Sequence, residues 1–391
     1  MGQYSWFTVY KIRKPDYILK FVCLFHTMKL FSIETLKADF HNKCESRETK
    51  DFNIKKQDYF WVGLKMDYIQ RLENEMCRTD AYESEYIAKC LRYAEKLLDS
   101  ELPVLFDRKH VNKVLKMWQL KFPCYSSFYI KGKRKYREIM APSLKLKRRQ
   151  RWILENILEK IPLSQYCHGF VRGRSIVTNA RGHIGKARIL TMDIQDFFPS
   201  IKEEQVREVF QSAGYSLSAA ERLTEICCFQ GKLPQGAPSS PYLANLFCRE
   251  LDEELGEIAR KYELIYTRYA DDMTFSGDKE LEFLIPLVED MLRKYGFSIN
   301  EEKTRIGNNH KMVTGLLLEE NTMKIPKHFK RKLKQEIYYC KKYGVFSHLQ
   351  NTGETNRVNF REYLYGKAYY IKMVEPKTGE KFLKDLDSIQ W

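Results

Sequence analysis

Several features that would identify other kinds of protein are absent from this sequence. Its ten cysteines include no Cys-x-x-Cys pair, which excludes the usual spacing of a structural zinc site, and they suggest no disulfide framework. We therefore expect reduced thiols and a cytoplasmic protein. The most apolar stretch, residues 17–31, is interrupted by Lys20, His26 and Lys29 and lacks a cleavage site. It is too short and too charged to span a membrane, so no membrane partner is expected.

Acidic residues are too few to balance the basic ones, and the excess of positive charge is concentrated. The net charge is +16, with a pI near 9.2. Residues 131–151 carry ten Lys or Arg and one acid, and residues 321–391 carry fifteen against seven, so the two regions together contribute +17. Segregated positive charge predicts a polyanionic partner, and tyrosines within these regions could stack on bases.

An acidic turn between two short β-type runs is the most informative stretch. In residues 264–277, β-branched and aromatic residues flank Asp271 and Asp272 and predict a hairpin. An isolated pair of this kind is commonly a solvated turn, but adjacent carboxylates repel each other and a divalent cation offsets the repulsion. Asp193 lies near the end of the buried-type strand predicted at residues 188–194 and is the candidate third carboxylate. Three such groups predict two-metal phosphoryl transfer.

Other segments predict surfaces for a nucleotide or a nucleic-acid backbone. Residues 128–142 predict a hairpin, and the basic helix expected at 144–161 favours contact with phosphates over a plain solvated face. The rigid loop 233–241 contains one glycine and three prolines and opens a helix that continues to about residue 262. Further helices are expected at 84–100, from Asp107 to about Trp118, and at 203–213, 217–229, 281–295, 326–343 and 359–374.

Several residues near the carboxylates have more than one possible role. Of Phe197 and Phe198, we expect one in the core and one against the sugar of an incoming nucleotide, where it would exclude a 2′-hydroxyl. Asp196 could be a second metal ligand, although a surface or capping role is the stronger alternative. Lys303 is equally consistent with a place near the leaving pyrophosphate and with a solvated lysine.

In their order along the chain, these motifs resemble the successive blocks of a reverse transcriptase. The resemblance covers about residues 85–391, and two short elements narrow it to the bacterial retron reverse transcriptases. Asn179-Ala180-x-x-His183 is similar to the NAxxH element of that group, and Val313-Thr314-Gly315 is similar to its VTG element. The other blocks are Tyr136-Arg137-Glu-Ile139, His168-Gly-Phe170, Asp193 with Phe198, Leu233-Pro-Gln-Gly236, Tyr269-Ala-Asp-Asp272 and Lys303.

The resemblance implies an α+β protein with the right-hand polymerase fold. Its parts would be fingers, a palm made of an antiparallel sheet plus helices, and a helical thumb. The implied boundaries are an N-terminal extension of unknown role (1–80), N-terminal helices and fingers (81–187), a palm with finger insertions that carries the catalytic aspartates (188–318) and a basic helical thumb (319–391).

The resemblance also implies roles for individual residues. Two Mg²⁺ ions, for which Mn²⁺ could substitute, would bind the catalytic residues Asp193, Asp271 and Asp272 and the Ile194 carbonyl. The nucleotide-binding residues would be Arg137 and Lys133 at the triphosphate, Gln235 and Gly236 in the loop, Phe198 as the sugar gate, and Lys303. The RNA-recognition residues would be Asn179, Ala180, His183, Val313, Thr314, Gly315, Arg148, Arg149, Lys330 and Arg331.

The implied function is RNA-directed DNA synthesis in an anti-phage defence retron. The template would be a cognate structured non-coding RNA, and synthesis from dNTPs would start at a guanosine 2′-hydroxyl to give branched RNA-linked DNA (msDNA). A separate effector protein is an expected partner. So is a host RNase H, because the 76 residues after Gly315 show no plausible carboxylate cluster. The alternatives are a group II intron-like or diversity-generating reverse transcriptase, and a scaffold that binds RNA and DNA to sequester an effector.

Overall fold

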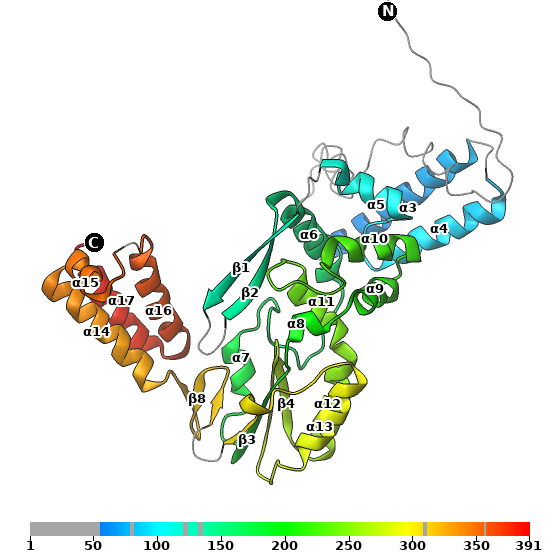
Figure 1. Ribbon diagram of the computed structural model, residues 1–391. Helices are drawn as coiled ribbons and strands as arrows, with labels where there is room; N and C mark the ends of the chain where they lie inside the picture. Colours follow the sequence, from blue (N-terminus) through cyan, green and yellow to red (C-terminus); the bar gives the residue numbers. More distant parts are fainter. Residues whose placement is uncertain (1–54, 79–81, 120–123, 132–135, 308–310, 356) are drawn as a thin grey trace, which may run out of the picture. The chain divides into compact units, whose positions relative to one another are not determined.

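The computed structural model describes residues 55–78, 82–119, 124–131, 136–307, 311–355 and 357–391 (Figure 1). They form two compact units. The first comprises the described residues up to Ile161 with 206–229 and 236–239, and the second comprises 162–205, 230–235 and 240–391. Lys133 and residues 1–54 of the predicted extension lie outside the described ranges. No helix within those ranges is both long and apolar enough to cross a membrane.

Helices and one hairpin build the first unit. Asp107 begins a helix, as predicted, because its carboxylate accepts a hydrogen bond from the His110 backbone N–H at 2.7 Å. The expected hairpin is also confirmed, with Phe128 opposite Ile139 in antiparallel register. The elements are α3 (Lys55–Cys77), α4 (Ser84–Asp99), α5 (Arg108–Val114), β1 (Tyr125–Lys131), β2 (Tyr136–Pro142), α6 (Leu144–Asn156), α10 (Leu217–Cys227) and most of α9 (Glu203–Ser212), with 3₁₀ turns at Met117–Gln119 and Leu158–Lys160.

A four-stranded antiparallel sheet with strand order β4-β5-β3-β6 organises the second unit. Helix α12 packs on β4 through an apolar stripe that buries Leu251 and Leu255, and α13 lies beside α12 (Figure 1). The single helix predicted to reach residue 262 is interrupted at Cys248, which begins α12. The elements are α7 (Ile176–Arg181), β3 (Arg188–Asp193), α8 (Phe197–Ser200), α11 (Ser240–Phe247), α12 (Arg249–Lys261), β4 (Ile265–Tyr269), β5 (Asp272–Gly277), α13 (Leu284–Lys294), a 3₁₀ turn (Glu301–Lys303) and β6 (Arg305–Gly307).

The C-terminal part of the second unit has its own apolar cluster. Ala180 of α7 and Val313 of the small β7-β8-β9 sheet share this cluster with Leu333 and Leu364. Two helices were expected after residue 326, but two more are present, since Gly344 (φ +81°) ends the first helix and allows another to start. The elements are β7 (Met312–Val313), β8 (Leu316–Leu318), β9 (Met323–Lys324), α14 (Lys327–Tyr343), α15 (Val345–Thr352), α16 (Phe360–Val374) and α17 (Pro376–Asp387).

Candidate active site

The acidic turn lies at the tip of the β4–β5 hairpin. Tyr269 and Asp272 are the last paired residues, so Ala270 and Asp271 form a two-residue turn. Ala270 has φ +57°, in the left-handed region that a residue with a Cβ seldom adopts. The turn therefore holds a strained backbone, at an expected cost on the order of 1 kcal/mol, directly before the two carboxylates.

Strand β3 supplies the third carboxylate. Asp193, its last residue, is directly opposite Asp272 in the β3–β5 register. The backbone N–H of Ile194 donates to the Asp271 carbonyl at 2.9 Å, which ties the end of β3 to the turn. On the other side of β3, the Asn300 N–H donates to the Asp193 carbonyl at 2.7 Å. The structure thus brings the three predicted catalytic residues to one end of the sheet, and neither backbone bond uses the Ile194 carbonyl.

The carboxylates are close enough to perturb one another. Burial and then the charge of Asp193 raise the pKa of Asp271. Partial burial, together with the charges of Asp271 and Asp193, raises the pKa of Asp272 to about 7. The Lys303 ammonium offsets part of this repulsion, because its Nζ lies 2.7 and 2.8 Å from the two Asp193 carboxylate oxygens. Lys303 is therefore neither simply solvated nor free, and it occupies the place of a counter-cation.

The same donor set suits a divalent metal. Carboxylate oxygens are the ligands that Mg²⁺ and Mn²⁺ prefer. In the part of the chain that the structure describes, no three His, Cys, Asp or Glu side chains are already arranged around one point as ligands. The ammonium of Lys303 on Asp193 nevertheless occupies a place where a metal cation would be favoured, beside carboxylates whose charges repel one another. The residues present therefore fit the predicted metal.

The two neighbouring phenylalanines have different environments. Phe197 is buried and stacks on Phe297, with ring centroids 5.8 Å apart. Phe198 is half-buried and packs at the edge of the core, 5.3 Å from the Phe197 ring. One ring of the pair is thus in the core, as expected, and Phe198 remains the candidate sugar gate. Asp196 is exposed, with φ +45°, and makes no capping hydrogen bond.

The loop residues predicted to hold the nucleotide are rigidly placed. Gly236 has φ +130°, and a Cβ there would lie 2.7 Å from the Met140 carbonyl oxygen on β2, so only glycine fits. Gln235 is half-exposed, and the Ser240 hydroxyl stabilises the loop by donating to the Pro234 carbonyl at 2.8 Å. Arg137 is exposed on β2. Their contacts with a nucleotide remain predictions.

The residues of the NAxxH element, which are predicted to serve RNA recognition, are buried. Asn179, Ala180 and His183 each have 0% of their surface exposed, as does Val313. The His183 ring bonds to hydroxyls on two strands, with Nδ1 2.6 Å from Ser276 Oγ and Nε2 2.8 Å from Thr267 Oγ1. Burial lowers the pKa of His183 to about 3, so its ring is neutral.

The two elements nevertheless meet in space. The Thr314 hydroxyl donates to the Ile176 carbonyl in α7 at 3.4 Å, and Ala180 and Val313 belong to one apolar cluster. Thr314 is half-buried and Gly315 is exposed, both with positive φ. Contacts of this kind hold α7 against β7 and β8, while His183 bonds to β4 and β5.

Two of the basic residues predicted for RNA recognition make contacts within the protein. Arg149 is 9% exposed, and its guanidinium donates to the carbonyls of Leu115, Lys116 and Lys145 at 2.7–2.9 Å. Lys330 is engaged by Glu375, at 2.7 and 2.8 Å. The donor groups of Arg149 and Lys330 thus make hydrogen bonds within the protein. Arg148 and Arg331 are exposed and remain available to phosphates.

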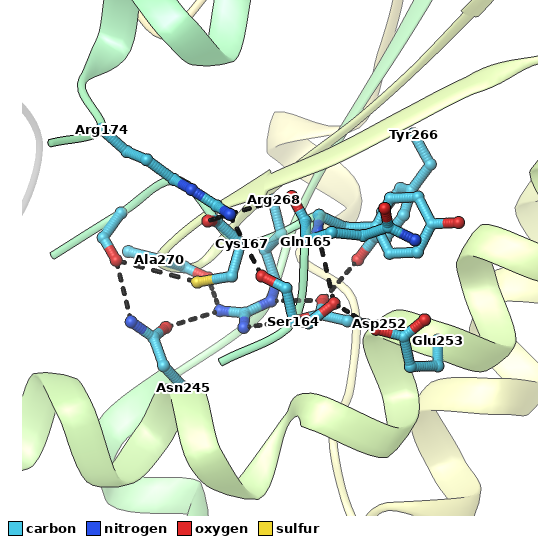
Figure 2. Close-up of polar contacts among 12 residues, drawn as sticks. Ser164, Gln165, Cys167, Arg174, Asn245, Asp252, Glu253, Tyr266, Arg268 and Ala270 are labelled. Atoms are coloured by element: carbon cyan, nitrogen blue, oxygen red, sulfur yellow. Dashed lines mark hydrogen bonds and ion pairs between the residues drawn. The ribbon is translucent and has the colours of Figure 1, made fainter. Parts of the chain in front are cut away.

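A buried polar network that the sequence did not predict lies beside the turn (Figure 2). Arg268 of β4 is fully buried and pairs with Asp252, a fully buried residue of α12. Asn245 and Arg174 extend the network to neighbouring backbone carbonyls. The available signal was an acidic residue between Leu251 and Leu255 on the apolar stripe of a helix, followed by an arginine inside an apolar strand.

Comparison with known proteins supports the same chemistry. Residues 129–335 match the family described as reverse transcriptase (RNA-dependent DNA polymerase). The retron Ec86 reverse transcriptase of Escherichia coli is 39% identical over 227 residues, covering 56% of this chain and 70% of that protein. The retron Se72 enzyme of Salmonella heidelberg is 34% identical (64% and 69% covered), and the retron Mx162 enzyme of Myxococcus xanthus is 32% identical (65% and 58%).

Proposed function

Because this chain belongs to the reverse transcriptases, and among them to the bacterial retron enzymes, we propose that it copies a cognate structured non-coding RNA from a guanosine 2′-hydroxyl. The product is branched RNA-linked DNA, msDNA, made for anti-phage defence together with a separate effector protein. A host RNase H removes the copied template. The observation that supports the polymerase chemistry most directly is the register that sets Asp193 opposite Asp272 beside the Asp271 turn.

In this proposal the three aspartates hold two divalent ions, with the Ile194 carbonyl as a further ligand. Bound Mg²⁺, or Mn²⁺ in its place, would activate the attacking hydroxyl and neutralise charge on the leaving pyrophosphate. Lys303 gives up its contacts with Asp193 in the loaded site. Because its side chain is 46% exposed, its ammonium can then donate to the pyrophosphate.

Phe198 is assigned as the sugar gate, and this assignment can be tested by itself. Phe198→Ala should lower the ratio of kcat/KM for dGTP over GTP by about 10-fold or more, because the space for a 2′-hydroxyl opens. Phe197→Leu is the matched control, since the Phe197 ring lies in the core and should affect stability instead. An unchanged ratio in a folded Phe198→Ala enzyme would remove the gate assignment.

The incoming nucleotide is assigned to four further residues. Arg137 and Lys133 contact the triphosphate, while Gln235 and Gly236 position the nucleotide beside the aspartates. The rigid backbone of the 233–241 loop supports this role, because a fixed loop loses little entropy when it binds.

The RNA partner is assigned to exposed basic residues. Arg148 and Arg331 contact phosphates, whereas Asn179, His183 and Val313 act by fixing α7 and the adjoining strands. RNA affinity should therefore fall steeply with salt, and removal of either exposed arginine should reduce the slope of log K against log salt by about 1. A flat salt response would contradict a phosphate-based interface.

Purification of the protein with its bound nucleic acid tests the whole proposal. The material is treated with RNase, DNase and a debranching enzyme. A DNA species that carries a short RNA remnant and shifts on debranching is expected. Bound RNA without attached DNA would instead indicate another class of reverse transcriptase or a binding-only scaffold.

A double Asp271→Asn, Asp272→Asn variant separates the polymerase from the scaffold. A polymerase loses both its DNA product and phage protection when the metal ligands lose their charge. Full protection by the double variant, with no DNA detectable, would favour the scaffold.

A further inference from the structure

A buried ion pair lies beside the catalytic turn. The Nε and Nη2 atoms of Arg268 in β4 donate to the two carboxylate oxygens of Asp252 in α12, both at 2.7 Å (Figure 2). The Tyr266 hydroxyl donates to the same carboxylate at 2.9 Å. Both charged side chains are fully buried. The planar, bidentate geometry fixes the guanidinium in one orientation relative to the sheet and the helix.

The third nitrogen of this guanidinium, Nη1, is directed at the turn. Nη1 of Arg268 donates to the Ala270 carbonyl at 2.9 Å and to Asn245 Oδ1 at 3.2 Å. The Asn245 amide in turn donates to the Gly169 carbonyl at 2.8 Å. One rigid group therefore connects α12, α11 and the residue that precedes Asp271.

The segment before α7 supports the turn from the other edge of β4. The Arg268 N–H donates to the Tyr166 carbonyl at 2.8 Å, and the His168 N–H donates to the Arg268 carbonyl at 2.7 Å. Arg174 clamps this segment through the carbonyls of residues 164, 165 and 167 (Figure 2). The turn is thus held both by the Arg268 guanidinium and by the segment before α7. These contacts stabilise a turn in which Ala270 has the unfavourable φ of +57°.

A buried ion pair is seldom more stabilising than apolar side chains of the same volume, so stability alone does not explain this network. We propose that Arg268 is a positioning residue for DNA synthesis: with its Nη1 also anchored on Asn245, it holds the Ala270 carbonyl, keeps the turn left-handed and so sets the direction of Asp271 and Asp272. Arg268 touches neither substrate nor metal in this role. It acts through the backbone of one residue, which makes the role separable from catalysis.

The test compares Arg268→Lys with the wild type in primer extension on a generic RNA template with a DNA primer, so it does not depend on the cognate RNA. Lysine keeps the charge beside Asp252 but cannot reach Asp252 and the Ala270 carbonyl at once. The kcat should fall about 10-fold or more while KM for dNTP changes less than about 3-fold, because orientation of the ligands and not nucleotide binding is lost. Arg188→Lys is the matched control, since Arg188 makes an ion pair at the opposite end of β3.

Hydrogen exchange in the metal-free protein supplies a readout that does not depend on activity. Peptides within residues 264–277 should exchange faster in Arg268→Lys, whereas α14 and α16 should keep their protection. Ala270→Gly, introduced into Arg268→Lys, should restore part of the kcat, because glycine adopts the left-handed turn without a tether.

Two results would overturn the proposal. One is a folded Arg268→Lys enzyme with normal kcat and normal exchange at the turn, and the other is no rescue by Ala270→Gly. If Arg268→Lys fails to fold, Asn245→Leu decides instead, because it leaves the ion pair with Asp252 intact and removes the link to Gly169. Faster exchange at the turn with a lower kcat supports the proposal, and unchanged values refute it.

Discussion

Replacing Gly169 with alanine should slow DNA synthesis about 100-fold without unfolding the protein. A Cβ at this position would lie 2.5 Å from the Ala270 nitrogen and 3.1 Å from the Tyr269 carbonyl carbon, both backbone atoms of the catalytic hairpin. Ordinary contact begins at 3.4 Å, so the two backbones must separate by about 0.9 Å. Since Asn245 and Arg268 tether both sides, the strain passes to the turn and displaces Asp271 and Asp272.

The assay is steady-state primer extension at saturating dNTP, with melting temperature measured in parallel. Gly379→Ala is the control for an equally severe clash elsewhere, because its Cβ would lie 2.3 Å from Lys372 Cα between α16 and α17. It should lower the melting temperature and leave kcat nearly unchanged. Gly366→Ala meets nothing within 4 Å and should be neutral or slightly stabilising.

A normal kcat in Gly169→Ala would refute the reasoning, because the hairpin could then move by most of an ångström without effect on catalysis. Equal losses of kcat in Gly169→Ala and Gly379→Ala would also refute it, since the effect would then reflect general destabilisation and not displacement of the aspartates.

Three further predictions follow from the described contacts. Asp272→Asn should abolish synthesis yet stabilise the metal-free protein at pH 8 by up to about 1 kcal/mol in urea unfolding, because the like charge opposite Asp193 is removed. His183 should contribute a loss of stability of about 1.4 kcal/mol per pH unit as pH drops from about 6.5 toward 3, because the unfolded state takes up a proton that the buried ring does not. The raised pKa of Asp272 acts in the opposite direction, so the measurement is the difference in slope between the wild type and His183→Gln in pH-dependent unfolding. Arg149→Ala should cost about 1–3 kcal/mol in the same measurement, since several buried carbonyls lose their donor, whereas Arg148→Ala should leave stability unchanged and weaken RNA binding only.

Local sequence patterns were sufficient to predict the hairpin. The run of β-branched and aromatic residues around Asp271 and Asp272 predicted two strands and a turn, and the structure has β4 and β5 there. The same holds for the strand that ends at Asp193 and for the cap at Asp107. Strand alternation and caps depend on residues within a few positions of each other, so they can be recognised from the sequence.

Residues that look alike in the sequence differ in how deeply they are buried. Arg148 and Arg149 are adjacent in one basic run, yet one faces solvent and the other is enclosed by carbonyls about thirty residues away in the chain. Asn179 and His183 belong to a recognisable motif, but only the tertiary structure shows that both are fully buried. Each assignment depends on which face of a helix meets the rest of the protein.

The sequence by itself determined the fold class, the family resemblance and the aspartates predicted to carry the reaction, because these depend on residue identity, order and short-range period. Only the tertiary structure decided that Asp193 is opposite Asp272, that Lys303 occupies the counter-cation position, and that Arg268 holds the Ala270 carbonyl. Those relations join residues far apart in the chain or depend on the conformation of a single turn. They arise from strand register and from the packing of α12 against β4, which no local pattern encodes.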